Sequence, residues 1–288
     1  MPYSARDYEY LFNIPTELDD TQIEKLRHKD VFRYRVKTIK SGDMLECEIY
    51  PLWKTRNNVR EARDHVTRLA QRNLNEKNAK KNLVRKINAN FTEEDIFVTL
   101  TYKGVVPDEE QARKDMRNYI RRVRAYRRKH KLSEIKYVYV IEFGRSEDGR
   151  RKRVHHHLIM SGMDRDTAES LWRNGRANTM RLQPDEYGLE GLTRYIVKEP
   201  KGSKRWASSR NLIEPVVTKS DTKLSKRQVE RLVKDVEDAP AAIFCKLYPG
   251  YGLNSCDIKH SDFVAGTYIY VSMTKNTTNR RDYNAAYY

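Results

Sequence analysis

The sequence lacks the features of secreted, membrane-spanning and ATP-driven proteins. It has three cysteines, and their spacing forms no CxxC pair, which argues against a disulfide framework and a zinc knuckle. The N-terminal residues are polar and acidic, so we expect no signal peptide, and no apolar run is long enough to cross a bilayer. No GxxxxGK[ST] motif occurs, which predicts that the chain has no ATP site of the P-loop type. We therefore expect a soluble, cytoplasmic protein with reduced thiols.

Negative charge is scarce relative to positive charge. The chain has 57 Lys and Arg against 40 Asp and Glu, a formal net charge of +17. An excess of this size is typical of proteins that bind a polyanion, most often nucleic acid. A basic protein that is merely soluble is the alternative. The segment 111–131 contains ten Lys and Arg and a single acid, Asp115, a pattern that fits a phosphate-binding surface and a solvated helix face about equally.

The hydrophobic pattern predicts a protein of the α+β class. A hairpin is expected over residues 31–52 and a long helix over 56–88. The following segment predicts, in order, a strand, a helix, two strands, a helix, a strand and a helix, at residues 96–102, 108–130, 135–144, 151–160, 164–174, 178–183 and 185–199. This order, with a tight hairpin in the middle, predicts a central antiparallel sheet flanked by helices.

The two ends of the chain are expected to extend this core. A charged helix is predicted over residues 224–237 and short strands over 241–273. We expect four regions: an N-terminal hairpin and long basic helix, the core, a C-terminal helix with short strands, and a disordered tail, at residues 1–90, 91–205, 206–273 and 274–288.

Three consecutive histidines lie in one of the predicted strands. Residues i and i+2 of a strand point to the same face, so His155 and His157 project together and His156 projects the other way. A two-residue turn at Asp148-Gly149 would place Glu142 directly opposite His155, on the same face. Two imidazoles and one carboxylate suit a catalytic divalent cation better than a closed zinc site. A polar strand face without a ligand is the alternative.

A tyrosine nucleophile is the second candidate feature. The pattern YxxK places a hydroxyl and an ammonium group on one face of a helix, where both can reach a phosphate. It occurs three times, at Tyr34–Lys37, Tyr126–Lys129 and Tyr195–Lys198. Tyr34 lies in the predicted hairpin, and Tyr126 lies in the arginine-rich helix before the histidines. Tyr195 follows the histidines on a helix that ends in a basic loop, so position favours Tyr195.

The segments "FVTLTY", "HHH" and "YIVK", in this order, resemble the three motifs of HUH endonucleases, the rolling-circle replication initiators of plasmids and single-stranded DNA phages. "YVIEFG", "RVHHHLIMSG" and "LWRNG" resemble the replication-associated proteins related to filamentous-phage and microvirus initiators. The resemblance spans about residues 96–200. It implies an RRM-like sheet that suits single-stranded DNA, in an HUH nuclease core.

The resemblance also implies a chemistry. His155, His157 and Glu142 would bind Mg²⁺ or Mn²⁺, which polarises the scissile phosphate. Tyr195 would attack that phosphate, leaving a 5′-phosphotyrosyl link and a free 3′-OH, and strands would later be rejoined. Lys198 would position the phosphate or the metal, or favour the phenolate. Some relatives carry a second tyrosine where this chain has Gly191, so we expect a single-tyrosine enzyme and interpret Tyr187 as a packing residue.

The implied partners are a single-stranded DNA origin in a bacterial host cell and the host's helicase and polymerase. Basic and aromatic residues are the candidates for DNA binding: Arg113, Lys114, Arg117, Arg121, Arg122, Lys204, Arg205 and Trp206. Trp172 is expected in the core. Three alternatives stay open: a non-catalytic nucleic-acid binder on the same fold, an HUH transposase, and a zinc hydrolase for which Tyr195 would be irrelevant.

Overall fold

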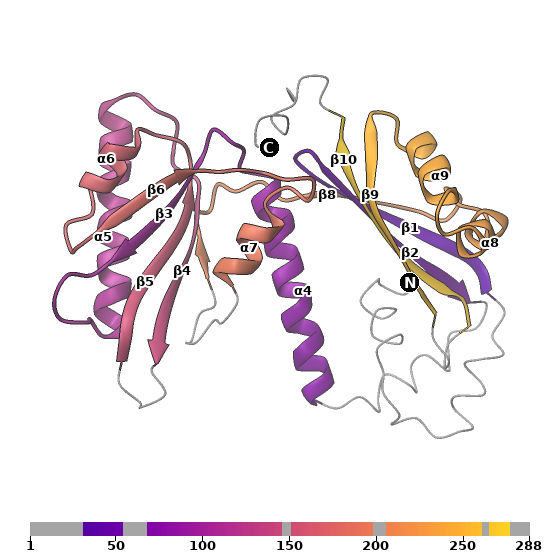
Figure 1. Ribbon diagram of the computed structural model, residues 1–288, viewed down its shortest axis with the longest axis horizontal. Coiled ribbons are helices and arrows are strands. Elements are labelled where there is room, and N and C mark those ends of the chain that lie inside the picture. Colours follow the sequence, from indigo (N-terminus) through magenta and orange to yellow (C-terminus); the bar gives the residue numbers. More distant parts are fainter. Residues whose placement is uncertain (1–30, 54–67, 146–150, 198–205, 261–264, 277–288) are drawn as a thin grey trace, which may run out of the picture. The chain divides into compact units, whose positions relative to one another are not determined.

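The computed structural model describes residues 31–53, 68–145, 151–197, 206–260 and 265–276 (Figure 1). Within these residues the chain forms two five-stranded antiparallel sheets and six helices, which confirms the α+β class. The chain divides into two compact units. Unit 1 combines residues 1–79 with 215–288, and unit 2 comprises residues 80–214. Unit 2 is thus inserted into the chain of unit 1.

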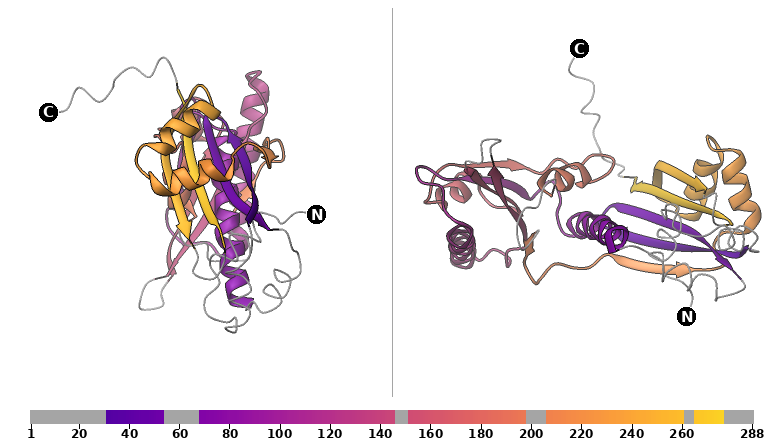
Figure 2. Two further views of the ribbon diagram at one scale, coloured as in Figure 1. Left: turned by 90° about the vertical axis from the view of Figure 1, so that its right-hand side faces the viewer. Right: turned by 90° about the horizontal axis from the view of Figure 1, so that it is seen from below.

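Unit 1 joins segments from both ends of the chain in one sheet. The strand order is β8-β1-β2-β10-β9, and neighbouring strands are antiparallel. In Figure 2 the indigo hairpin and the yellow hairpin lie side by side, because β2 pairs with β10. The strands are β1 (Val31–Ser41), β2 (Met44–Trp53), β8 (Val216–Ser220), β9 (Tyr251–His260) and β10 (Thr267–Lys275). The hairpin expected over residues 31–52 is confirmed.

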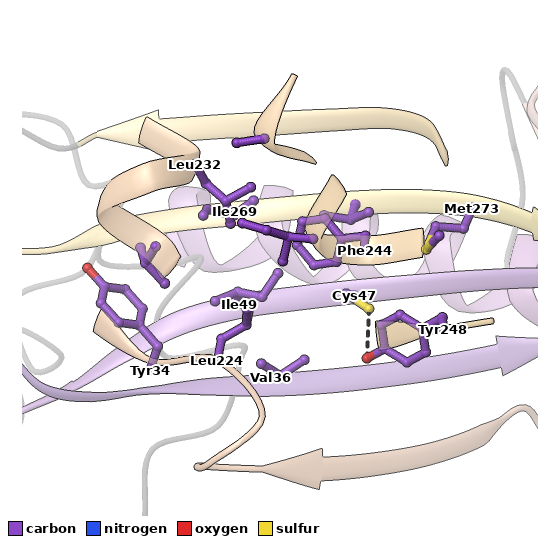
Figure 3. Close-up of a cluster of buried hydrophobic side chains, with 14 of the residues drawn as sticks. Tyr34, Val36, Cys47, Ile49, Leu224, Leu232, Phe244, Tyr248, Ile269 and Met273 are labelled. Carbon is purple, nitrogen blue, oxygen red and sulfur yellow. Dashed lines mark hydrogen bonds between the residues drawn. The ribbon is translucent and has the colours of Figure 1, made fainter. Parts of the chain in front are cut away.

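Two helices, α8 (Lys226–Lys234) and α9 (Ala239–Leu247), cover one face of this sheet. The charged helix expected over residues 224–237 is confirmed as α8. The expectation of short strands from residue 241 is wrong for α9, whose Phe244 packs among Ile49, Ile269 and Leu232 (Figure 3). A short apolar run looks the same in a buried strand and a buried helix, and here a proline in the first turn starts the helix.

Unit 2 has the predicted order of elements around a second sheet. The strand order is β6-β3-β5-β4-β7, so β3 and the histidine strand β5 lie side by side in the interior of the sheet. The strands are β3 (Ile96–Thr101), β4 (Tyr137–Arg145), β5 (Arg151–Met160), β6 (Ala177–Arg181) and β7 (Ala207–Ser208). The helices are α4 (Arg68–Asn88), which runs into this unit from unit 1, α5 (Glu109–Lys129), α6 (Arg165–Ser170) and α7 (Glu190–Ile196).

Both faces of the unit 2 sheet are covered, each by different helices (Figure 1). Alternate residues of the strands belong to two separate hydrophobic clusters. On one face, Leu158 packs with Met116 and Tyr119 of α5, a surface that we call the α5 face. On the other, Ile159 packs with Ile196 of α7 and Ile87 of α4, which we call the α7 face. Within each strand, consecutive residues therefore face opposite sides of the sheet and pack against different helices.

The last predicted helix of this unit is shorter than expected. It was expected over residues 185–199, but α7 begins at Glu190. Asp185 and Gly188 exchange two backbone hydrogen bonds of 3.0 Å in a turn before it. Gly188 has a φ of 69°, a conformation that interrupts a helix and that glycine adopts without strain. Tyr187 therefore lies in this turn and not on the helix.

Several expectations fall on residues outside the described ranges. They concern the start of the long helix at 56–67, the hairpin turn at 146–150 and the tail beyond residue 276. In the part of the chain that the structure describes, no helix is both long enough and apolar enough to cross a membrane.

Candidate active site

The pairing of β4 with β5 confirms the predicted register at the histidines. Glu142 lies opposite His155, and Val140 lies opposite His157. The ladder shifts only nearer the turn, between Phe143 and Arg145. Glu142, His155 and His157 therefore share one face of the sheet, and it is the α7 face, because Val140 belongs to the cluster there.

The three side chains are close to one another on this face. The imidazole Nε2 of His157 lies 3.1 Å from Oε2 of Glu142, and the rings of His155 and His157 stack with centroids 6.2 Å apart. Phe97 of β3 stacks on the His157 ring with centroids 5.8 Å apart. The His157 side chain is only 6% exposed, whereas that of Glu142 is 53% exposed. The His157 ring is therefore fixed by its neighbours in the sheet, whereas the Glu142 carboxylate is accessible to solvent.

His157 is in the form that can bind a cation. Burial lowers its pKa from the ordinary value, and the hydrogen bond and charge of Glu142 oppose that effect only in part. The ring is therefore neutral at pH 7, and a neutral imidazole is the form that coordinates metals. Its second nitrogen, Nδ1, is buried and has no hydrogen-bond partner.

The donor set fits a divalent cation in its chemistry. Two imidazoles and a carboxylate on one face are ligands that Mn²⁺ and related ions accept. Nevertheless, no three His, Cys, Asp or Glu side chains among the described residues converge as a complete set of metal ligands. In this structure the Glu142 carboxylate is hydrogen-bonded directly to Nε2 of His157. Cation binding would therefore exchange the hydrogen bond between these two side chains for a shared ion.

Tyr195 of α7 reaches the same face. Ile196 and Val197, which follow it, are buried in the cluster of the α7 face and hold this end of the helix on the sheet. The Tyr195 ring lies edge-on to the His157 ring, with centroids 5.7 Å apart and an interplanar angle of 71°. Tyr195 is 61% exposed, so an incoming phosphate can reach its hydroxyl. Lys198 lies outside the described residues.

His156 faces away from this constellation, as the strand alternation predicts. It is fully buried, its Nε2 lies 3.0 Å from the hydroxyl of Tyr102, and that hydroxyl donates to Asp115 of α5. Burial lowers the pKa of His156 to about 3, so the ring is neutral. This network ties β5 to α5, and strand alternation alone does not predict it. The isolated acid Asp115 within a basic helix was the available signal.

The candidate DNA-binding residues of α5 differ in their surroundings, although all lie on the helix that covers the α5 face. Arg113 pairs with Glu109, and Arg122 donates from Nε to the backbone oxygen of Leu171. Lys114, Arg117 and Arg121 are exposed.

The remaining candidates lie elsewhere. Lys204 and Arg205 fall outside the described residues. Trp206 is half-buried against the cluster of the α7 face. Trp172 is in the core, as expected, and donates from Nε1 to the backbone oxygen of Thr101.

Arg127 of α5 is a structural residue, and its removal should destabilise unit 2. It is buried and donates to the backbone oxygens of Ser133 and Gly162, both at 2.8 Å. Arg127→Met would leave both acceptors unsatisfied, so we expect a loss of about 3 kcal/mol in unfolding free energy. Hydrogen exchange of the β5 amides would measure it. Arg128→Met, an exposed neighbour, is the control and should change it by less than about 0.5 kcal/mol; equal effects would contradict this role.

Comparison with known proteins gives one match. Residues 95–200 match the family model described as replication-associated protein ORF2/G2P. No curated protein and no solved structure matches the chain. The matched segment lies within unit 2 and contains Glu142, His155, His157 and Tyr195. Over residues 95–200, the chain is therefore similar to the replication-associated protein ORF2/G2P family.

Proposed function

We propose that the protein starts rolling-circle replication by nicking single-stranded origin DNA with Tyr195 as the nucleophile. One observation carries the proposal. Within the family segment, the exposed Tyr195 ring lies 5.7 Å from the His157 ring, on the sheet face that also bears His155 and Glu142. A protein that only binds DNA has no need to bring a tyrosine, two imidazoles and a carboxylate together.

The proposed reaction is a reversible transfer of a phosphodiester bond. The Tyr195 oxygen attacks the scissile phosphorus, so that a bond from this oxygen to phosphorus forms and the bond from phosphorus to the 3′ oxygen breaks. The phenolic proton leaves and the 3′ oxygen takes up a proton, which gives a 5′-phosphotyrosyl link and a free 3′-OH. Attack by a 3′-OH on the tyrosyl phosphate reverses the reaction. Rejoining therefore needs no ATP.

The residues of the site have separate roles in this proposal. His155, His157 and Glu142 would hold Mg²⁺ or Mn²⁺, which when bound supplies Lewis-acid polarisation of the scissile phosphate. Packing of α7 on the sheet positions Tyr195, and the Phe97 stack fixes the orientation of His157. Lys198 follows Tyr195 by three residues, and we propose that it positions the phosphate or favours the phenolate. The host would supply the helicase and the polymerase.

End-labelled DNA tests the proposed function. The full-length protein would be mixed with single-stranded DNA from its own replicon in the presence of Mn²⁺. DNA labelled at its 3′ end should form a labelled covalent adduct on a denaturing protein gel. DNA labelled at its 5′ end should give a shorter free fragment that a polymerase can extend.

Other results would point to the other functions. Tight binding without any adduct would contradict the proposal and favour a non-catalytic binder. Cleavage that releases both fragments free of protein would favour a metal hydrolase.

A further inference from the structure

The solvent-facing side of α5 carries a row of positive charge that the proposed reaction does not use. Its residues recur every three or four positions, a spacing that places them on one side of a helix. The row, which we call the α5 cation stripe, consists of Lys114, Arg117, Arg121, Arg124 and Arg128. All five are exposed. From the first to the last, the stripe extends about 21 Å along the helix.

The charge of this stripe is not neutralised. In the described part of the chain, no carboxylate forms an ion pair with any of the five side chains. The only acid within residues 111–131 is Asp115, which is buried and accepts hydrogen bonds from Tyr102 and Gln111. Nearby cations add to the charge. Burial is the main cause that lowers the pKa of Arg122, and the positive charges of Arg173 and Arg121 lower it further. Such a concentration of one sign attracts a polyanion.

The stripe lies on the far side of the sheet from the candidate nucleophile. The α5 helix packs on the α5 face, whereas Tyr195 and His157 lie on the α7 face. Both assignments belong to unit 2, so they do not depend on how the two units are placed. DNA bound at Tyr195 would therefore have to pass around the edge of the sheet to reach the stripe. The stripe is suited to a separate stretch of DNA.

The stripe is better suited to a duplex than to a single strand. Proteins that hold single strands combine positive charge with aromatic side chains on which bases stack. On α5, Tyr119 is buried and Tyr126 is stacked on His130 with centroids 4.1 Å apart, so neither is a free platform. The tyrosines beside the stripe, Tyr137 and Tyr139, are partly buried against the core and stack on each other, and the Arg124 guanidinium lies 5.8 Å from the centroid of the Tyr137 ring. Over about 21 Å of its axis a duplex carries roughly six phosphates per strand, and a straight row of cations meets those that face it.

We propose that the α5 cation stripe binds the phosphate backbone of duplex DNA, so that unit 2 holds a duplex on its α5 face and a single strand on its α7 face. The single strand at Tyr195 belongs to the proposed function, on which this second surface rests. A nicking site is a natural place for such an arrangement, because the single strand that is cut continues into duplex on at least one side. The contacts are electrostatic and independent of base sequence.

Equilibrium binding tests this surface without cleavage. The full-length protein in EDTA would be titrated into a short duplex of arbitrary sequence and into a single strand of equal length, at several salt concentrations. The triple variant R117Q/R121Q/R124Q should bind the duplex at least about tenfold more weakly. The slope of log affinity against log salt should fall by roughly 2 to 3, since each lost duplex contact removes about 0.9. Binding of the single strand should change less than about twofold.

A matched control separates position from total charge. The variant K226Q/R227Q/R231Q removes three exposed cations from α8 of unit 1. It should leave the salt slope for duplex DNA within the error of the wild type. Equal losses in both triple variants would overturn the proposal, as would an equal loss of single-strand and duplex binding in the α5 variant.

The two proposals fail in different ways. A wild-type protein that forms the tyrosyl adduct but does not bind duplex DNA in EDTA would overturn the α5 surface alone. A wild-type protein that binds the duplex through α5 but forms no adduct would overturn the nicking function and leave the α5 measurement valid.

Discussion

The variant Tyr195→Phe should form no covalent adduct with single-stranded DNA, and its cleavage rate should fall by at least about 10³-fold. The substitution removes only the hydroxyl oxygen that would bond to phosphorus. The ring would stay edge-on to His157, and Ile196 and Val197 would still hold α7 on the sheet. Fold and DNA binding should therefore persist. A denaturing gel with 3′-labelled DNA measures the adduct, and filter binding measures the affinity.

Tyr187→Phe is the matched control for this experiment. Tyr187 is the nearest tyrosine in the sequence before Tyr195, but it lies in the turn before α7. Its loss of a hydroxyl should leave adduct formation within about twofold of the wild type. An adduct that persists in Tyr195→Phe and disappears in Tyr187→Phe would identify the other tyrosine as the nucleophile. An adduct that persists in both variants would refute both assignments.

Removal of His157 should have the second largest effect. We expect His157→Ala to reduce adduct formation by more than about 10²-fold at saturating DNA. Even substitution of a residue that only hydrogen-bonds to a metal ligand typically lowers metal affinity or activity by about 10- to 100-fold. His155→Ala should act in the same direction. The His155 ring is only half-buried, so its removal leaves a smaller cavity than removal of the buried His157 ring. The His155→Ala variant should therefore destabilise the fold less. Chelation of divalent ions should reduce the wild type to the same background.

Direct measurement of Mn²⁺ binding makes this prediction independent of cleavage. Electron paramagnetic resonance of the full-length protein without DNA should detect a bound Mn²⁺ that both histidine variants lose. His130→Ala removes an exposed histidine at the end of α5 and should retain the ion. If His157→Ala binds Mn²⁺ and forms the adduct like the wild type, the ion is not held at this histidine. Hydrogen exchange of the β5 amides would show whether each variant is folded.

The local geometry of the histidine hairpin could be derived from the sequence alone. Strand alternation has a period of two, so the opposite orientations of His156 and His157 follow once the strand is recognised. A two-residue turn at Asp-Gly predicts the pairing of Glu142 with His155. The turn lies outside the described residues, and the strands have this pair. The order of elements in unit 2 follows in the same way from hydrophobic periods over nearby residues.

Contacts between distant residues could not be derived in this way. The YxxK pattern by itself does not distinguish its three occurrences. Position along the chain favours Tyr195, and the structure shows that the three tyrosines have different surroundings. Tyr34 is in the core of unit 1, Tyr126 stacks on His130 at the end of α5, and Tyr195 lies against His157. Likewise, the basic character of α5 is plain in the sequence, whereas its position on the opposite side of the sheet from Tyr195 is not.

The sequence by itself determined the features that depend on neighbouring residues: the α+β class, the strand faces and the hairpin register. Only the tertiary structure decided that β2 pairs with β10 across more than 200 residues, and that α9 is a helix. The physical reason is the same in both cases. The hydrophobic effect is non-directional, so the hydrophobic pattern of the sequence shows which residues become buried but not against which surface. Packing of the whole chain selects that surface.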